Sequence, residues 1–255
     1  MIDKKIEKKI KIMIDEEVVN DLVYFDNLKI VQNKEYFNFS LDSVLLPNFC
    51  CLNKSTKKII DLCTGNAPIP LILSTMTNAN IIGVEIQKNI YDLAIKSVKI
   101  NKLEEKINII NEDVRKIDNY FDTDTFDLIT CNPPYFKLNE KSILNDNSVK
   151  SIARHEININ LDDIMKISKK LLKNNGSICI VHRTDRLIEI IDKMKKNNIE
   201  PKRIRFIYPK VGKESNLVLI DGHKNGKIGL KLLPPLYVHN EDGSYTEEVL
   251  KMFGK

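Results

Sequence analysis

Short apolar runs alternate with longer amphipathic stretches from Ile59 onward, and this alternation constrains the fold more than any other feature of the sequence. Four apolar runs of four or five residues have the length of buried strands: 58–62, 81–85, 107–110 and 126–130. The stretches between them include two with helical character, 69–75 and 90–101. Strands that alternate with helices of this length predict an α/β fold with a mostly parallel sheet covered on both faces.

The second half of the chain continues this pattern. We expect an amphipathic helix at 161–173, stopped by the Asn175-Gly176 pair, and another at 186–197, capped by Thr184. Three further strands are expected at 177–181, 203–208 and 217–220.

Residues 1–55 do not follow the α/β pattern. A charged helical start is followed by an expected hairpin, in which 28–32 pairs with 35–39 around Asn33 and Lys34. The stretch 41–51 then has the character of a short helix capped by Ser40. We therefore expect 1–55 to be an attached extension and 56–255 to form the main domain.

Composition limits the partners and the compartment. The net charge of +5 weakly favours a polyanionic binding partner, although part of the lysine excess reflects a general bias of the composition towards lysine, isoleucine and asparagine. Five cysteines without a C-x-x-C spacing favour reduced, cytosolic thiols and no metal site. No run approaches the roughly 18 apolar residues of a membrane helix, and the start lacks a signal-peptide core, so we expect a cytoplasmic protein without a membrane partner.

Chemistry is expected where the strands end, because open α/β sheets bind ligands beyond the carboxyl ends of their strands. The first strand leads into a turn of small residues, with Asp61, Cys63, Thr64, Gly65 and Ala67. Only Gly65 remains of a three-glycine pattern, so the dinucleotide fingerprint is not met, yet small residues still let a ligand approach the backbone. Glu85 ends the second strand, 20 residues after Gly65, where a carboxylate can bind both hydroxyls of a ribose.

The strongest motif is Asn132-Pro133-Pro134-Tyr135, directly after the fourth strand. The two prolines fix an extended backbone and remove two N–H donors, which leaves carbonyl oxygens beside the Asn132 amide oxygen. Two converging acceptors fit an amino group with its two N–H donors, and Tyr135 offers a flat face for a planar ring. The motif therefore predicts a site that holds a planar amino group with its lone pair open to an electrophile.

These motifs, in this order, resemble class I methyltransferases that act on amino nitrogens. Further segments resemble the bacterial tRNA(Val) adenine-N6 methyltransferases, which modify the base at position 37 beside the anticodon. They are 37–46 (FNFSLDSVLL), 152–156 (IARHE), 201–210 (PKRIRFIYPK), 233–236 (LPPL) and 241–247 (EDGSYTE). The resemblance runs from about residue 28 to the C-terminus.

The resemblance implies a Rossmann-like sheet of seven strands with the last one antiparallel, and S-adenosylmethionine as cofactor, with S-adenosylhomocysteine as product. In this family the turn from Asp61 to Ala67 would wrap the methionine part of the cofactor, and Glu85 would bind its ribose. Asp113 would meet the adenine of the cofactor, with Val114 against the ring. Asn132, Pro133, Pro134 and Tyr135 would hold the target base next to the cofactor, and residues 1–55 would cover the cofactor side. Cys63 departs from the usual glycine.

A tRNA partner needs cations outside the pocket, and no obligate protein partner is implied. Candidate contacts with RNA are Phe39, Arg154, His155, Lys202, Arg203, Arg205 and Lys210. Arg154 and His155 are equally compatible with a loop salt bridge, and Phe39 with ordinary packing. Strand alternation places Arg203 and Arg205 on the face opposite Phe206, which is expected in the core.

Three other functions fit parts of the sequence. A release-factor glutamine N5-methyltransferase shares the Asn-Pro-Pro-Tyr motif, because an amide is also a planar amino group, but usually has a longer helical N-terminal domain. DNA adenine methylation lacks an evident target-recognition domain. A non-catalytic RNA-binding module that retains the fold is supported only by the reduced glycine turn.

Overall fold

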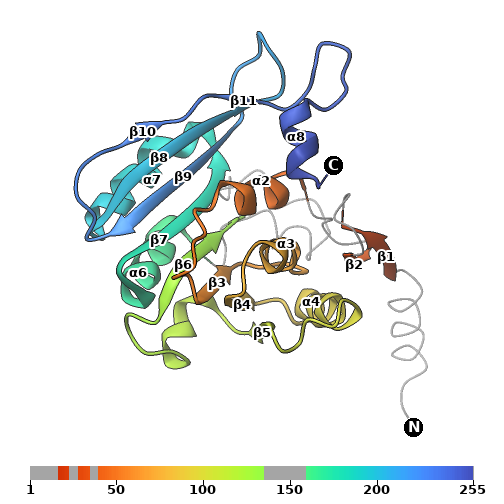
Figure 1. Ribbon diagram of the computed structural model, residues 1–255. Helices are drawn as coiled ribbons and strands as arrows, with labels where there is room; N and C mark the ends of the chain where they lie inside the picture. Colours follow the sequence, from red (N-terminus) through yellow and green to blue (C-terminus); the bar gives the residue numbers. More distant parts are fainter. Residues whose placement is uncertain (1–16, 23–27, 35–39, 135–158, 255) are drawn as a thin grey trace, which may run out of the picture.

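The computed structural model describes residues 17–22, 28–34, 40–134 and 159–254, which fold into a central sheet with helices on both faces (Figure 1). The strands are β1 (Glu17–Asp21), β2 (Lys29–Asn33), β3 (Lys58–Leu62), β4 (Asn80–Glu85), β5 (Ile107–Asn111), β6 (Phe126–Cys131), β7 (Leu172–Arg183), β8 (Ile199–Tyr208), β9 (Leu217–Lys224), β10 (Lys231–Leu232) and β11 (Leu236–Tyr237). The helices are α2 (Asp42–Phe49), α3 (Pro68–Met76), α4 (Lys88–Ile100), α6 (Leu161–Leu171), α7 (Leu187–Lys196) and α8 (Glu247–Met252), with 3-10 turns η1 (Val114–Asn119) and η3 (Thr184–Arg186).

The sheet confirms the predicted fold class. Its strand order is β5-β4-β3-β6-β7-β9-β8-β10, and β11 also pairs with β8. The pairs among β3 to β7 are parallel, whereas β9 runs antiparallel to both β7 and β8. The chain reverses its direction of travel across the sheet between β3 and β6, which is the position where such folds bind ligands. The short strands β10 and β11 extend the seven strands that were expected.

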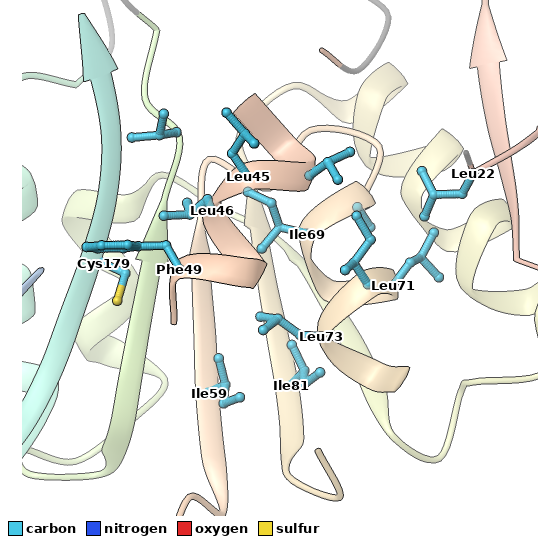
Figure 2. Close-up of a cluster of buried hydrophobic side chains, with 14 of the residues drawn as sticks. Leu22, Leu45, Leu46, Phe49, Ile59, Ile69, Leu71, Leu73, Ile81 and Cys179 are labelled. Atoms are coloured by element: carbon cyan, nitrogen blue, oxygen red, sulfur yellow. The ribbon is translucent and has the colours of Figure 1, made fainter. Parts of the chain in front are cut away.

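Two hydrophobic clusters lie on opposite faces of this sheet. One joins the sheet to α2, α3, α4 and α8, and Figure 2 shows Leu45, Leu46 and Phe49 of α2 in this cluster with Ile69 and Leu73 of α3. The other joins the sheet to η1, α6 and α7. Each fully buried leucine or isoleucine contributes about 1.5–3 kcal/mol to the stability of the fold. The two clusters therefore hold the strands, and with them the strand ends, in fixed positions.

Two hydrogen bonds connect α2 with residues from the last quarter of the chain. The side-chain amide of Asn48 donates to the carbonyl of Met252 at 3.2 Å, and Arg203 donates to the carbonyl of Phe49 at 2.9 Å. Because α2 also packs in the same cluster as β3, the proposed division at residue 55 does not separate two cores. The division into 1–55 and 56–255 stays a prediction.

The hairpin prediction was half right. Residues 29–33 form a strand, but its partner is the upstream strand β1, with Glu17 opposite Asn33. The β-branched pair Val18-Val19 favours a strand there, which was not expected from the sequence. Residues 35–39 lie outside the described residues.

Three local predictions were wrong. The helix α6 ends at Leu171, and Asn175 and Gly176 lie inside β7, where Asn175 adopts a φ of 62° at an irregularity in the pairing with β6. Ser40 does not cap α2 with its side chain, since Leu41 occupies the N-cap position. Thr184 opens η3 and its hydroxyl bonds with Ser215 at 2.9 Å, so it does not cap α7.

Candidate active site

The predicted cofactor residues and Asn132 lie at the end of, or just after, strands whose carboxyl ends lie at one edge of the sheet. The register pairs Leu62 with both Val84 and Cys131, and pairs Glu85 with Asn111. The carboxyl ends of β6, β3, β4 and β5 are therefore level with one another. At about 4.8 Å between neighbouring strands, these four ends span roughly 14 Å, enough for an extended ligand.

The turn after β3, residues 63–67, has an unusual backbone that we call the cofactor turn. Cys63, Gly65 and Ala67 have φ angles of 59°, 59° and 70°, in the left-handed region. This conformation costs roughly 1–2 kcal/mol for residues other than glycine, so the turn explains why three glycines are expected at these positions. A Cβ placed on Gly65 would meet no described atom within 4 Å, so the space beside the middle of the turn is open.

Asp61 supports the cofactor turn from beneath. Its two carboxylate oxygens accept hydrogen bonds from Thr64 and Thr130, each at 2.6 Å, and the side chain is completely buried. Burial raises the pKa of Asp61 to about 7, against the two hydrogen bonds, and the charge of Glu85 raises it further. Asp61 therefore links the turn to the end of β6.

Glu85 connects the end of β4 to the same turn. One carboxylate oxygen accepts from the backbone N–H of Gly65 at 3.0 Å and the other from that of Gln87 at 2.9 Å. The residue is only 6% exposed, and this burial raises the pKa of its carboxyl group. Glu85 is thus held in a single orientation next to the open space at Gly65.

Asp113 and Val114 follow β5. The Asp113 carboxylate caps η1 through the backbone N–H of Arg115 at 2.9 Å and also accepts from the guanidinium of Arg115, which lowers the pKa of Asp113. Val114 is buried against the second hydrophobic cluster. The predicted contact of Asp113 with an adenine would therefore share the carboxylate with Arg115.

The Asn132-Pro133-Pro134 segment leaves β6 directly beside the cofactor turn. Cys131, the last residue of β6, pairs with Leu62, the residue before the turn. Pro133 is buried, whereas Asn132 and Pro134 are half-buried at this edge of the sheet. Tyr135 lies outside the described residues, as do Phe39, Arg154 and His155.

Two of the predicted RNA contacts are held by other parts of the protein. Arg203 pairs with Asp221, donating at 2.7 Å through Nε, and its guanidinium lies 4.5 Å from the centre of the Phe49 ring. Arg205 pairs with Glu248 at 2.6 Å. The strand alternation was correct, but each guanidinium group is paired with a carboxylate of this chain, that of Arg203 with the buried Asp221 and that of Arg205 with the exposed Glu248.

The two predicted lysines differ from these arginines. Lys202 donates to the carbonyl of Lys227 at 2.9 Å, and Lys210 lies exposed in the loop after β8. Any contact of this strand with RNA is therefore expected from its lysines.

Two supporting residues were missed at the level of the sequence. Thr130 binds Asp61 because β3 and β6 place these residues directly opposite each other. Asn66, inside the cofactor turn, donates to the carbonyl of Val31 at 2.9 Å and so connects the turn to the β1–β2 hairpin. The alignment of the two strand-end motifs would have revealed Thr130, whereas nothing in the sequence signals the contact of Asn66.

A sheet of this order, with a small-residue turn, a strand-end acid and an Asn-Pro-Pro segment at its switch point, defines a methyltransferase. Residues 53–226 match the family described as "Methyltransferase domain". This match spans more than half of the chain, and the chain belongs to that family.

Relatives of known name extend the comparison over most of the chain. A tRNA1(Val) (adenine(37)-N6)-methyltransferase of Bacteroides fragilis is 25% identical over 196 residues, covering 77% of this chain and 81% of that protein. One of the same name from Shewanella woodyi is 24% identical over 221 residues, covering 84% and 89%. The resemblance stated from the sequence is therefore confirmed.

Solved structures share the fold. A predicted O-methyltransferase from Agrobacterium tumefaciens superposes with a TM-score of 0.68 at 17% identity, covering 84% of this chain and 95% of that one. TYW2 from Pyrococcus horikoshii, in complex with MeSAdo, gives a TM-score of 0.57 at 13% identity, covering 83% and 73%.

Membership of this family implies S-adenosylmethionine as methyl donor, and the residues present fit it. The open space at Gly65 admits a ligand against the backbone, and the oriented carboxylate of Glu85 borders that space. In the parts of the chain that the structure describes, no cluster of three or more His, Cys, Asp or Glu side chains is arranged to hold a metal. No helix among these residues is long and apolar enough to cross a membrane.

Proposed function

We propose that this methyltransferase acts on N6 of an adenine in tRNA, with A37 beside the anticodon of tRNA(Val) as its target. The observation that carries the proposal is the position of Asn132-Pro133-Pro134, which leaves β6 level with the end of β3 and the cofactor turn. The names of the relatives support tRNA as the substrate.

The proposed mechanism relies on positioning. When bound, S-adenosylmethionine supplies a methyl group on a positively charged sulfur, and S-adenosylhomocysteine is the leaving group of the transfer. Glu85 would hold the ribose of the cofactor, while Oδ1 of Asn132 and the carbonyl of Pro133 would accept hydrogen bonds from the two N–H groups of the target amine. These contacts turn the nitrogen lone pair towards the methyl group and replace a chance encounter with a fixed geometry.

Neighbouring groups keep competing reactions low. The Cys131 thiol lies beside Cys63 close to the reaction centre, and burial raises its pKa well above the ordinary range. It therefore stays protonated, and a thiol is a far weaker nucleophile than a thiolate. No strong base is needed for the target, because the amino nitrogen loses its proton readily once it has been methylated.

An anticodon-loop adenine suits this site. Such a base is already unpaired, so turning it into a pocket costs less than extracting one from a duplex.

The test of the mechanism is the variant Asn132→Ala. We expect kcat with unmodified tRNA to fall at least about 100-fold, on the scale of removing one well-placed polar group from an active site. Binding of S-adenosylmethionine, measured by calorimetry, should stay close to wild type. Asn108→Ala, at an exposed position of β5, is the matched control and should keep full activity. A kcat of Asn132→Ala close to that of the wild type would refute the role of Asn132.

The substrate is tested by offering labelled cofactor with unmodified tRNA, release factor or DNA. We expect N6-methyladenosine in tRNA by nucleoside mass spectrometry, mapped to position 37 of tRNA(Val). Labelled glutamine in the release factor, with no label in tRNA, would replace the proposal by the protein-methylating alternative. Binding of tRNA without any methyl transfer would support the non-catalytic one.

A further inference from the structure

A surface depression of about 630 Å³ lies at the end of β8, apart from the residues assigned so far to the cofactor and the target base. It is lined by Pro209, Lys210, Lys213, Glu214, His239 and Gly243. These residues come from two loops, 209–216 after β8 and 238–246 after β11. Figure 1 shows two blue loops projecting from the sheet next to β11.

Backbone hydrogen bonds and ring stacking fix the shape of this depression. The N–H of His239 donates to the carbonyl of Pro209 at 2.9 Å, which ties the two loops together. The ring of His239 stacks on that of Tyr245, with 4.8 Å between the centres and 24° between the planes. In the first loop, Ser215 donates to the carbonyl of Ile207 at 2.9 Å. A ligand therefore meets a preformed surface and loses little affinity to loop ordering.

The lining of the depression carries two lysines against one acidic residue, whereas Glu241 and Asp242 of the second loop are not part of the lining. Lys210 and Lys213 are both exposed, and Glu214 is the one acidic residue in the lining. Within the described part of the chain, neither lysine forms an ion pair, in contrast to Arg203 and Arg205. Two unpaired ammonium groups a few residues apart are suited to the phosphates of a nucleic acid.

The topology places this depression on the active-site edge of the sheet. Because β9 is antiparallel to both β7 and β8, β8 runs in the same direction as β3, β6 and β7. Its carboxyl end thus points to the edge where Asn132 leaves β6. Three strand spacings separate β6 from β8, which is roughly 14 Å.

We infer that this depression binds the sugar-phosphate backbone of the substrate RNA next to the target base, with Lys210 and Lys213 on its phosphates. This inference rests on the proposed function, since it takes the polyanion to be RNA. An RNA strand whose adenine sits at Asn132 passes along this edge, and the two lysines add affinity without touching the reacting atoms.

The test is the double variant Lys210→Gln/Lys213→Gln. Because both side chains are exposed, their replacement should leave the circular dichroism spectrum and cofactor binding unchanged. The control is Lys99→Gln/Lys196→Gln, which removes two exposed charges at the C-terminal ends of α4 and α7. These helices return to the opposite edge of the sheet, so the control removes the same charge far from the site.

Binding of unmodified tRNA is measured over a range of salt concentrations, together with steady-state kinetics. For the double variant we expect KM for tRNA to rise on the order of tenfold with kcat retained. The slope of log K against log salt should fall by about 1.4, or about 0.7 for each lost single-strand phosphate contact. The control should match the wild type in both measurements.

The possible failures are distinguishable. If the wild type methylates tRNA but the double variant keeps its KM and its salt slope, the inference is overturned and the proposed function stands. An equal rise in KM for tRNA in the control variant also overturns the inference, because the effect then comes from the total charge of the protein. If the wild type neither binds nor methylates tRNA, the proposed function fails, and the inference with it.

Discussion

Replacing Asp61 by asparagine tests the electrostatics of the site, because this carboxyl group has no access to solvent. Burial raises its pKa from the ordinary 3.8 to about 7. Between these values the folded protein keeps a proton that the unfolded chain has released. The contribution of Asp61 to the stability of the wild type therefore falls as the pH rises through this window.

The size of the effect follows from the two pKa values. A difference of about three pH units, at about 1.4 kcal/mol for each, corresponds to about 4 kcal/mol over the whole window. About 3 kcal/mol of this falls between pH 5 and pH 8. Asparagine does not titrate, and its amide still offers an acceptor to one threonine and a donor to the other.

Asp61→Asn should therefore gain about 3 kcal/mol over the wild type as the pH rises from 5 to 8. The assay is urea unfolding of both proteins at each pH, since their difference cancels the contribution of all other groups. The matched control is Asp127→Asn. Asp127 lies at the start of β6, whereas Asp61 bonds to Thr130 near the end of that strand. Burial raises the pKa of Asp127, but hydrogen bonds from Lys173, Lys57 and Lys58 outweigh it, so the net pKa is lowered. Its loss of stability should be constant between pH 5 and 8. A constant difference for Asp61→Asn as well would refute the reasoning.

Three further predictions concern other parts of the fold. Gly65→Ala places a Cβ on left-handed backbone, so urea unfolding should show a loss of about 1–2 kcal/mol in the free energy of unfolding. The same Cβ enters the open space of the cofactor turn, so calorimetry should also show a loss of cofactor affinity. Arg203→Met leaves the buried carboxylate of Asp221 without its cation and should cost about 3–5 kcal/mol; a cost below 1 kcal/mol would contradict this. Burial lowers the pKa of His182 to about 4, so the contribution of His182 to the stability of the wild type should fall by about 3 kcal/mol as the pH falls from 6.5 to 4, opposite in sign to that of Asp61. His182→Gln should lack this loss, measured as the pH dependence of its unfolding relative to the wild type.

The strands from β3 to β9 were predictable because each apolar run is short and is followed by residues that stop a strand. The site was predictable for the same reason, since Glu85 and Asn132 directly follow such runs. Their convergence then follows from parallel strands, whose carboxyl ends lie at one edge.

The sequence did not reveal contacts between distant residues or the backbone conformation of irregular segments. Asn175-Gly176 suits a helix stop and a β irregularity equally well, because both need a left-handed residue. Arg203 was read as a surface cation because its partner, Asp221, lies on another strand. The positive φ of Cys63 does not follow from the residue itself, since cysteine does not favour it, and only the glycine that is usual at this position in the family indicates it.

The ties of α2 to Arg203 and Met252 have a consequence for synthesis of the chain. At about 5–20 residues per second, a ribosome adds Met252 roughly 10–40 s after Asn48. During this interval α2 has been synthesised without Val249 and Phe253, which belong to the same apolar cluster as Leu45, Leu46 and Phe49. The nascent chain therefore holds an incomplete apolar surface for tens of seconds, which is when a chaperone that recognises such surfaces would bind it.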